Sequence, residues 1–125
     1  MEDVDLAVTA ARNTSFKTVV ATAPTLQLTV MNLAPGKNIG MERHDGHAQL
    51  VTVTDGHACC YLNGSRTALG TGSMVLIPPG AMHDITNTDG ARPLKLVVTY
   101  SPQKFPDSAE YATKEDAERA EQQQQ

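Results

Sequence analysis

Short runs of β-branched and apolar residues, separated by Gly, Pro, Asn and Asp, extend over most of the chain. Apolar side chains occupy every second position at Leu26, Leu28 and Val30, and again from Leu94 to Tyr100, as in strands with one buried face. This pattern predicts an all-β fold, an antiparallel sandwich or barrel. The expected strands cover residues 16–22, 25–33, 39–44, 49–54, 57–62, 66–69, 74–77, 83–87 and 94–100. Asn63-Gly64 predicts a two-residue hairpin turn, because both positions need positive φ.

The β pattern stops after Pro102. Residues 113–121 predict a short helix with Thr113 as its N-cap. Glu115 and Asp116 fall in the first turn, where the helix dipole favours negative charge. We therefore expect one domain over residues 1–125, with a β core of about residues 14–102 and a helical tail over residues 103–125.

The 125 residues carry a formal net charge of −4 and no basic run, which argues against nucleic acid or an anionic membrane as a partner. The acidic first residues lack a secretory signal, and no segment approaches the roughly 20 apolar residues of a transmembrane helix. We therefore expect a cytoplasmic protein. The two cysteines are adjacent, and the alternation of Ala58, Cys60 and Leu62 predicts that Cys60 faces the core.

Four polar side chains near the middle of the chain have the types and spacing of metal ligands. Glu42 and His44 are two residues apart on an expected strand, so both point to one face. Gln49 begins the return strand after a turn, and Pro79-Gly80 turns the chain so that His83 reaches the same cavity. Oxygen and imidazole donors together suit a divalent transition metal, namely Mn, Fe, Co, Ni or Zn. We expect the metal ligands to be Glu42, His44, Gln49 and His83.

The spacing around these residues resembles the two motifs of the cupin superfamily. The first runs from Gly36 to Gly56 through Glu42, His44 and Gln49, and the second from Gly72 to Asn87 through Pro78, Gly80 and His83. The chain is similar to the small single-domain cupins called mannose-6-phosphate isomerase-like. This resemblance implies a double-stranded β-helix, the cupin jelly-roll barrel, often dimeric and with a metal near the mouth of the barrel.

The commonest cupin pattern has His at the position of Glu42 and Glu at the position of Gln49. Together the two exchanges leave the formal charge of the four-residue set unchanged, at one negative charge. Gln49 offers only a neutral amide oxygen, so it either binds the metal directly or hydrogen-bonds a bound water. Without Gln49 the set is two histidines and one carboxylate, the set used by non-haem iron oxygenases.

Three functions remain open at this point. The first is an isomerase-like, metal-dependent enzyme that acts on a small oxygenated substrate, sugar-like or a hydroxy or keto acid, by Lewis-acid catalysis. The second is an Fe- or Mn-dependent dioxygenase. The third is a non-catalytic module that binds a metal or a small ligand. The sequence identifies no catalytic base, and the strand edges of a short barrel favour a homodimer in each case.

Other polar residues receive simpler interpretations. His47 lies in a turn and His57 at the exposed start of a strand, so both are expected at the surface. Binding of a sugar phosphate needs an Arg or Lys that faces the cavity. Arg43 alternates outward between two inward ligands, and no clear inward placement is indicated for Arg66, Arg92 or Lys95. The sequence therefore predicts no phosphate site.

Overall fold

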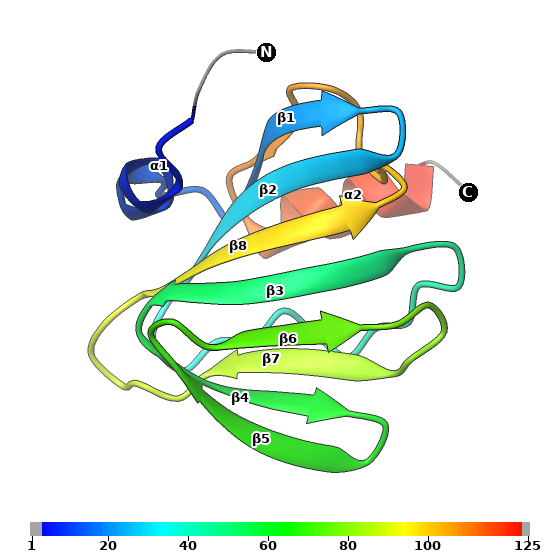
Figure 1. Cartoon of the computed structure of the whole chain (residues 1–125). Helices are drawn as coiled ribbons and strands as arrows, with labels where there is room; N and C mark the ends of the chain where they lie inside the picture. Colours follow the sequence, from blue (N-terminus) through cyan, green and yellow to red (C-terminus); the bar gives the residue numbers. More distant parts are fainter. Residues whose placement is uncertain (1–3, 124–125) are drawn as a thin grey trace.

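The computed structural model describes residues 4–123, which form two antiparallel β-sheets around a shared core (Figure 1). The larger sheet has the strand order β6 (Met74–Ile77), β3 (Ala48–Asp55), β8 (Leu94–Ser101), β2 (Leu26–Leu33), β1 (Lys17–Ala23) and β9 (Glu110–Tyr111). The smaller sheet has the order β5 (Ser65–Gly70), β4 (His57–Leu62) and β7 (His83–Asn87). The predicted all-β jelly-roll fold is confirmed.

Alternation along the strands builds the core between the two sheets. Leu96 and Val98 of β8 are at most 1% exposed, and Ile85 of β7 faces them from the smaller sheet with 0% exposure. Burying one such aliphatic side chain contributes about 1.5–3 kcal/mol. Cys60 belongs to the same core at 2% exposure, as the alternation predicted, while Cys59 is only partly buried.

Two local predictions are also confirmed. Asn63 and Gly64 both have positive φ, at 46° and 90°, and they connect β4 to β5 as a tight hairpin turn. The predicted helix forms as α2 (Lys114–Gln123). Thr113 caps it, because its hydroxyl oxygen accepts a hydrogen bond from the N–H of Asp116 at 3.1 Å.

A helix that the sequence analysis did not predict, α1 (Leu6–Arg12), lies against the outer face of the larger sheet (Figure 1). Asp5 is its N-cap and accepts a hydrogen bond from the N–H of Val8 at 3.1 Å. Ala10 is fully buried against Val30 and Val97 of β2 and β8. A helix of seven residues is marginal alone, so its contact with the sheet stabilises it.

The predicted strand over residues 39–44 is wrong. This segment instead makes two isolated bridges to β7, Asn38 with Thr86 and Glu42 with His83. Asn38 and Glu42 are four residues apart, whereas their partners Thr86 and His83 on β7 are three residues apart. One extra residue between Asn38 and Glu42 therefore bulges out of the pairing. Gly40 lies between the bridges with a φ of 105°, which glycine adopts far more readily than other residues.

The side chain of Asp84 on β7 holds this bulge in place of regular strand pairing. Its two carboxylate oxygens accept hydrogen bonds from the N–H of Gly40 and from Asn38 Nδ2, both at 2.9 Å. Asn38 Oδ1 in turn accepts a hydrogen bond from Lys114 Nζ of α2 at 3.2 Å. The bulge is therefore fixed by side chains of β7 and α2.

The residues after β8 pack onto the barrel through the fully buried Gln27. Its amide oxygen accepts hydrogen bonds from the N–H groups of Lys104 and Phe105, at 3.0 and 2.8 Å, and its amide nitrogen donates to the C=O of Phe105. The ring of Phe105 meets that of Tyr100 edge to face, with 5.2 Å between centroids. The tail thus forms part of the barrel wall.

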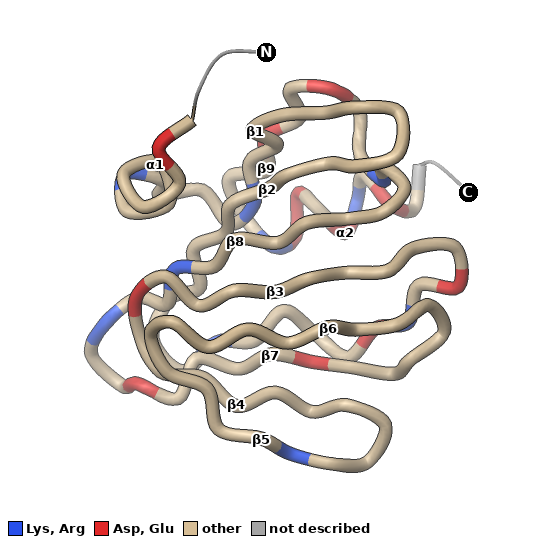
Figure 2. The backbone as a smooth tube through the Cα atoms, viewed as in Figure 1, with Lys and Arg blue, Asp and Glu red and all other residues tan. Residues whose placement is uncertain are grey.

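Charged residues gather in the loops, near strand ends and on α2 (Figure 2). Strands β2 and β6 carry none, and β3 carries one only at its last residue, Asp55. Few polar side chains are therefore buried among residues 4–123, namely Lys17, Gln27, Thr29, Gln49, His83, Asn87 and Lys95. Neither helix in this part of the chain is long and apolar enough to cross a bilayer.

Candidate metal centre

Two segments far apart in the sequence bring the candidate ligands together. Glu42 and His44 follow the bulge at Gly40, and His83 is the first residue of β7. Glu42 and His83 exchange both backbone hydrogen bonds at 2.9 Å, which places their side chains on the same face. The C=O of His44 accepts a hydrogen bond from the N–H of Gly80 at 3.0 Å, so the turn before β7 also fixes His44.

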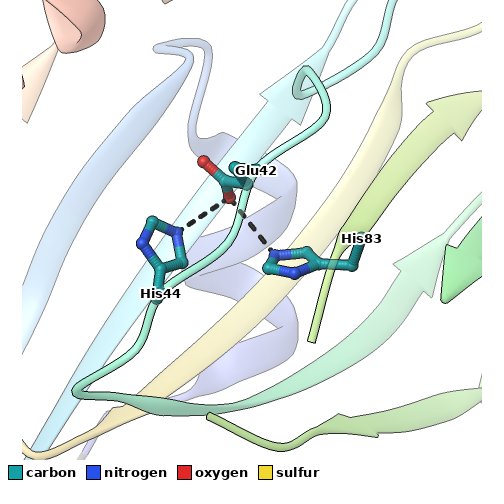
Figure 3. Close-up of side chains that lie close together, drawn as sticks. All are labelled: Glu42, His44 and His83. Carbon is teal, nitrogen blue, oxygen red and sulfur yellow. Dashed lines mark ion pairs between the residues drawn. The ribbon is translucent and has the colours of Figure 1, made fainter. Parts of the chain in front are cut away.

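The three side chains converge inside the barrel (Figure 3). Glu42 Oε1 lies 3.2 Å from His44 Nε2 and 3.4 Å from His83 Nε2. One ligating atom from each residue lies within 4.8 Å of the others. The side chains of His83, His44 and Glu42 are 2%, 10% and 24% exposed, so Glu42 is the most accessible of the three. Two imidazoles and one carboxylate at this spacing can hold a divalent transition metal.

The ring of His83 is oriented by a backbone contact. Its Nδ1 lies 2.9 Å from the C=O of Ala81, so Nδ1 carries the proton and Nε2 turns a lone pair towards the cluster. Gln49 of β3 is 4% exposed, and its amide Nε2 lies 3.3 Å from the same His83 Nε2. Rotating this amide group by 180° would place its carbonyl oxygen, instead of its N–H, towards the cluster. Gln49 thus faces the cluster, and its role as a fourth ligand stays a prediction.

His44 gives the clearest indication that a cation fits here. Its Nε2 is buried and has no hydrogen-bond partner among the residues that the structure describes. Glu42 Oε1 is close, at 3.2 Å, but lies outside the direction of a hydrogen bond from this nitrogen. Leaving such a group unpaired costs about 1–3 kcal/mol, which a cation bound by the two imidazoles and the carboxylate would offset. The donor set therefore fits a divalent metal.

The surrounding charges favour the ionised form of Glu42. Burial raises the pKa of this carboxyl, but the contacts with His44 and His83 and the charge of Lys17 outweigh burial and hold the pKa well below its ordinary value. Burial lowers the pKa of His83, whereas Glu42 and the C=O of Ala81 raise it, and the net shift is upward. Glu42 is therefore negative at neutral pH, and a proton competes with a metal for His83 as the pH falls.

The neighbouring polar residues lie outside this cluster. His57 is exposed, and Arg43 is exposed and pairs with Asp45 at 2.9 Å, as the sequence predicted for both side chains. His47 is half-buried, with its Nδ1 3.0 Å from the C=O of Pro102. Its ring centroid is 6.5 Å from that of His44, so His47 lies at the rim of the site.

The sequence analysis missed Lys17, the first residue of β1. This side chain is 5% exposed, and its Nζ donates a hydrogen bond to Tyr100 Oη at 2.9 Å. Burial lowers the pKa of Lys17 to about 8, although the charge of Glu42 acts in the opposite direction. Lys17 and Glu42 line one cavity of about 160 Å³ beside α2. Alternation could have revealed this basic group, because Lys17 and Val19 share the buried face of β1.

The fold and the converging Glu and His side chains define a cupin. A family model described as "Cupin domain" matches residues 29–100, a range that includes Glu42, His44, Gln49 and His83. The chain therefore belongs to the cupin family.

Individual relatives cover different shares of the chain. It is 32% identical over 116 residues to the uncharacterized protein YrkC of Bacillus subtilis, covering 88% of this chain and 62% of YrkC. It is 36% identical over 62 residues to gentisate 1,2 dioxygenase 1 of Aquipseudomonas alcaligenes, covering 50% of this chain and 18% of that enzyme. The chain thus spans less than two thirds of the length of these curated relatives. The crystal structure of BH2720 from Bacillus halodurans is similar with a TM-score of 0.91 and 29% identity, covering 94% of this chain and 93% of that one.

Proposed function

We propose that this chain is a metal-dependent, isomerase-like enzyme that acts on a small oxygenated substrate, sugar-like or a hydroxy or keto acid, by Lewis-acid catalysis. One observation carries the proposal. The buried His44 Nε2 has no hydrogen-bond partner among the described residues, and it lies 3.2 Å from the same Glu42 oxygen that is 3.4 Å from His83 Nε2. The ligand atoms of imidazole and carboxylate carry partial or full negative charge. They repel one another at these distances unless a cation lies among them.

The chain's own residues have distinct roles in this proposal. Glu42, His44 and His83 would hold the metal, and Gln49 would complete the set directly or through a water. The Ala81 C=O keeps the proton on His83 Nδ1, so that Nε2 remains free to bind. The near-complete burial of His83 and Gln49 keeps bulk water from this side of the site. A divalent metal bound there supplies Lewis-acid polarisation of a carbonyl or hydroxyl oxygen.

A dioxygenase that depends on Fe or Mn is the second candidate function. It would use the same two histidines and one carboxylate, a set found in non-haem iron oxygenases. The similarity to a gentisate 1,2 dioxygenase over 62 residues also favours this function. Because that match covers only 18% of the dioxygenase, Lewis-acid chemistry remains the first proposal.

Metal content is the first test of the proposal. The wild type, purified without a nickel column, should contain about one metal per chain by elemental analysis. His83→Ala should lose the metal, whereas His57→Ala should keep it because His57 is exposed and outside the cluster. Iron or manganese would favour the dioxygenase, and zinc or nickel the Lewis-acid enzyme. A wild type that stays metal-free after incubation with each ion would contradict both functions and leave the third alternative, a non-catalytic ligand-binding cupin.

We also propose that the protein is a cytoplasmic homodimer. Strand β6 is at the edge of the larger sheet, and its residues Met74 and Leu76 are 62% and 64% exposed. An exposed apolar edge strand favours pairing with a second copy of the chain. Light scattering in solution should give twice the mass of one chain, and Leu76→Lys should shift it to a monomer. A wild type that is monomeric at micromolar concentration would contradict this assembly.

A further inference from the structure

Lys17 has an environment that the metal cluster does not explain. Its side chain is 5% exposed, and its hydrogen-bond partner is the hydroxyl of Tyr100 at 2.9 Å. Burial raises the pKa of Tyr100 well above its ordinary value, so this hydroxyl stays neutral. Within residues 4–123, Lys17 forms no ion pair. Burying a cation with no anion in direct contact is costly, so this arrangement favours a ligand that brings a negative charge to Lys17 itself.

The contacts around Lys17 leave room for such a ligand. Its Nζ lies 4.3 Å from the centre of the Phe105 ring and 5.2 Å from that of Tyr100, and these rings offset part of the cost of burial. An ammonium group has three donor hydrogens, and Tyr100 accepts one of them. The others can bind an acceptor in the adjacent cavity.

That cavity also contains a residue of the metal site. Its volume is about 160 Å³, and its walls include Lys17, Glu42, the apolar side chains of Phe16 and Ile39, and Ala117 of α2. Figure 3 shows one oxygen of Glu42 directed at the two histidines and the other pointing away from them. The cavity is large enough for a few water-sized groups, so it suits a molecule of few heavy atoms.

The balance of charge favours an anion once a metal is bound. Glu42 and Glu121 stabilise the charged form of Lys17, and Lys104 opposes it. Lys104 and Glu121 pair with each other at 3.3 Å and largely cancel, and Lys114 and Glu118 on the cavity wall have opposite charges. Lys17 and Glu42 also cancel each other, so a divalent cation at the cluster would make the whole region positive.

We propose that Lys17 is the anion-binding residue of the substrate site. The carboxylate of a small hydroxy or keto acid would pair with the Lys17 ammonium, while its neighbouring oxygen faces the metal ligands. This inference rests on the proposed metal-dependent function and narrows its substrate class from oxygenated molecules in general to small acids. The pairing is a charge-assisted hydrogen bond, and no covalent step is involved.

Calorimetric titration with glycolate and its neutral isostere glycolamide tests the pairing. The protein is used with the metal that it retains, and its metal content is measured in every sample. Wild type should bind glycolate more tightly than glycolamide. Lys17→Met should weaken glycolate binding about tenfold or more and reduce the preference for the charged ligand. Lys95→Met is the matched control, because Lys95 is also a buried lysine but lies at the opposite end of β8 from Tyr100.

The outcomes separate this inference from the proposed function. A Lys17→Met protein that keeps its metal and binds glycolate as the wild type does would overturn the anion site and leave the metal site standing. A metal-free wild type that still binds glycolate through Lys17 would overturn the metal site and support the anion site. If Lys17→Met fails to fold, Lys17→Gln provides a neutral group that can still bond to Tyr100. A wild type that shows no preference for glycolate over glycolamide overturns the inference without any variant.

Discussion

Replacing Glu42 by Gln keeps the shape of the side chain and removes the negative charge between His44 and His83. In the wild type, a metal present at 100 times its Kd stabilises the folded chain by about 2.7 kcal/mol. For a chain of 125 residues, an unfolding entropy of about 2.1 cal/mol/K per residue converts this free energy into a rise in Tm of about 10 °C.

The variant loses a charged ligand, so its metal affinity should fall at least about 100-fold, since even residues that only orient ligands contribute roughly 10- to 100-fold. The same metal concentration then equals the variant's Kd and stabilises it by about 0.4 kcal/mol, or a rise in Tm of less than about 2 °C.

Thermal unfolding followed by circular dichroism, with and without metal, measures both shifts. Glu115→Gln is the control, because Glu115 is exposed on α2 and outside the cluster. It should retain the full metal-dependent rise in Tm. If Glu42→Gln kept a shift of about 10 °C, Glu42 would not be a ligand and the reasoning from the convergence of the three side chains would be refuted.

Three further perturbations follow from the structure. Because burial lowers the pKa of Lys17 from 10.5 to about 8, the unfolded chain binds more protons than the folded chain between these values. The free energy of unfolding should therefore rise with pH in this window for the wild type relative to Lys17→Met. Urea titrations at pH 8 and pH 10 measure this, and the same difference in the free energy of unfolding between the two proteins at both pH values would contradict it. Gly40→Ala should lose about 1–3 kcal/mol of stability and also metal affinity, because its φ of 105° strains other residues and the bulge directs Glu42. Gly90→Ala, with no atom within 4 Å of the added methyl group, should change neither property. Gln27→Ala should destabilise the chain by at least about 2 kcal/mol and accelerate hydrogen exchange of the two N–H groups that its amide binds after β8, and unchanged exchange would count against that contact.

Local periodicity in the sequence predicted the fold, and three of the four residues expected as ligands, Glu42, His44 and His83, lie together in the structure. Alternation of apolar residues placed β2 and β8, and alternation along β4 gave the exposed position of His57. Glu42 and His44 do lie beside His83, and Arg43 is exposed, although the strand over residues 39–44 from which these positions were predicted does not form.

The errors arise where contacts distant in sequence decide the local structure. The segment over residues 39–44 has the composition of a strand, but the Asp84 carboxylate binds the backbone of Gly40 and stabilises a bulge that no local pattern shows. The short helix α1 depends on burial of Ala10 against Val30 and Val97. Alternation along β1 puts Lys17 on the buried face, but its contacts with Tyr100 and Phe105, which are distant in the sequence, are visible only in the structure.

The bulge at Gly40 has a consequence for transplanting this site into another barrel. In a regular strand, residues four apart share a face, yet Asn38 lies on the side of Asp84 and Glu42 on the side of His83. Straightening residues 38–42 into a regular strand of the same length would put Asn38 and Glu42 on one face, and would force either Asn38 off its anchor or Glu42 out of the cluster. The bulge is therefore as restrictive as the identity of the ligands. A graft that copies residues 38–44 onto a regular strand without the bulge would break one of the two contacts.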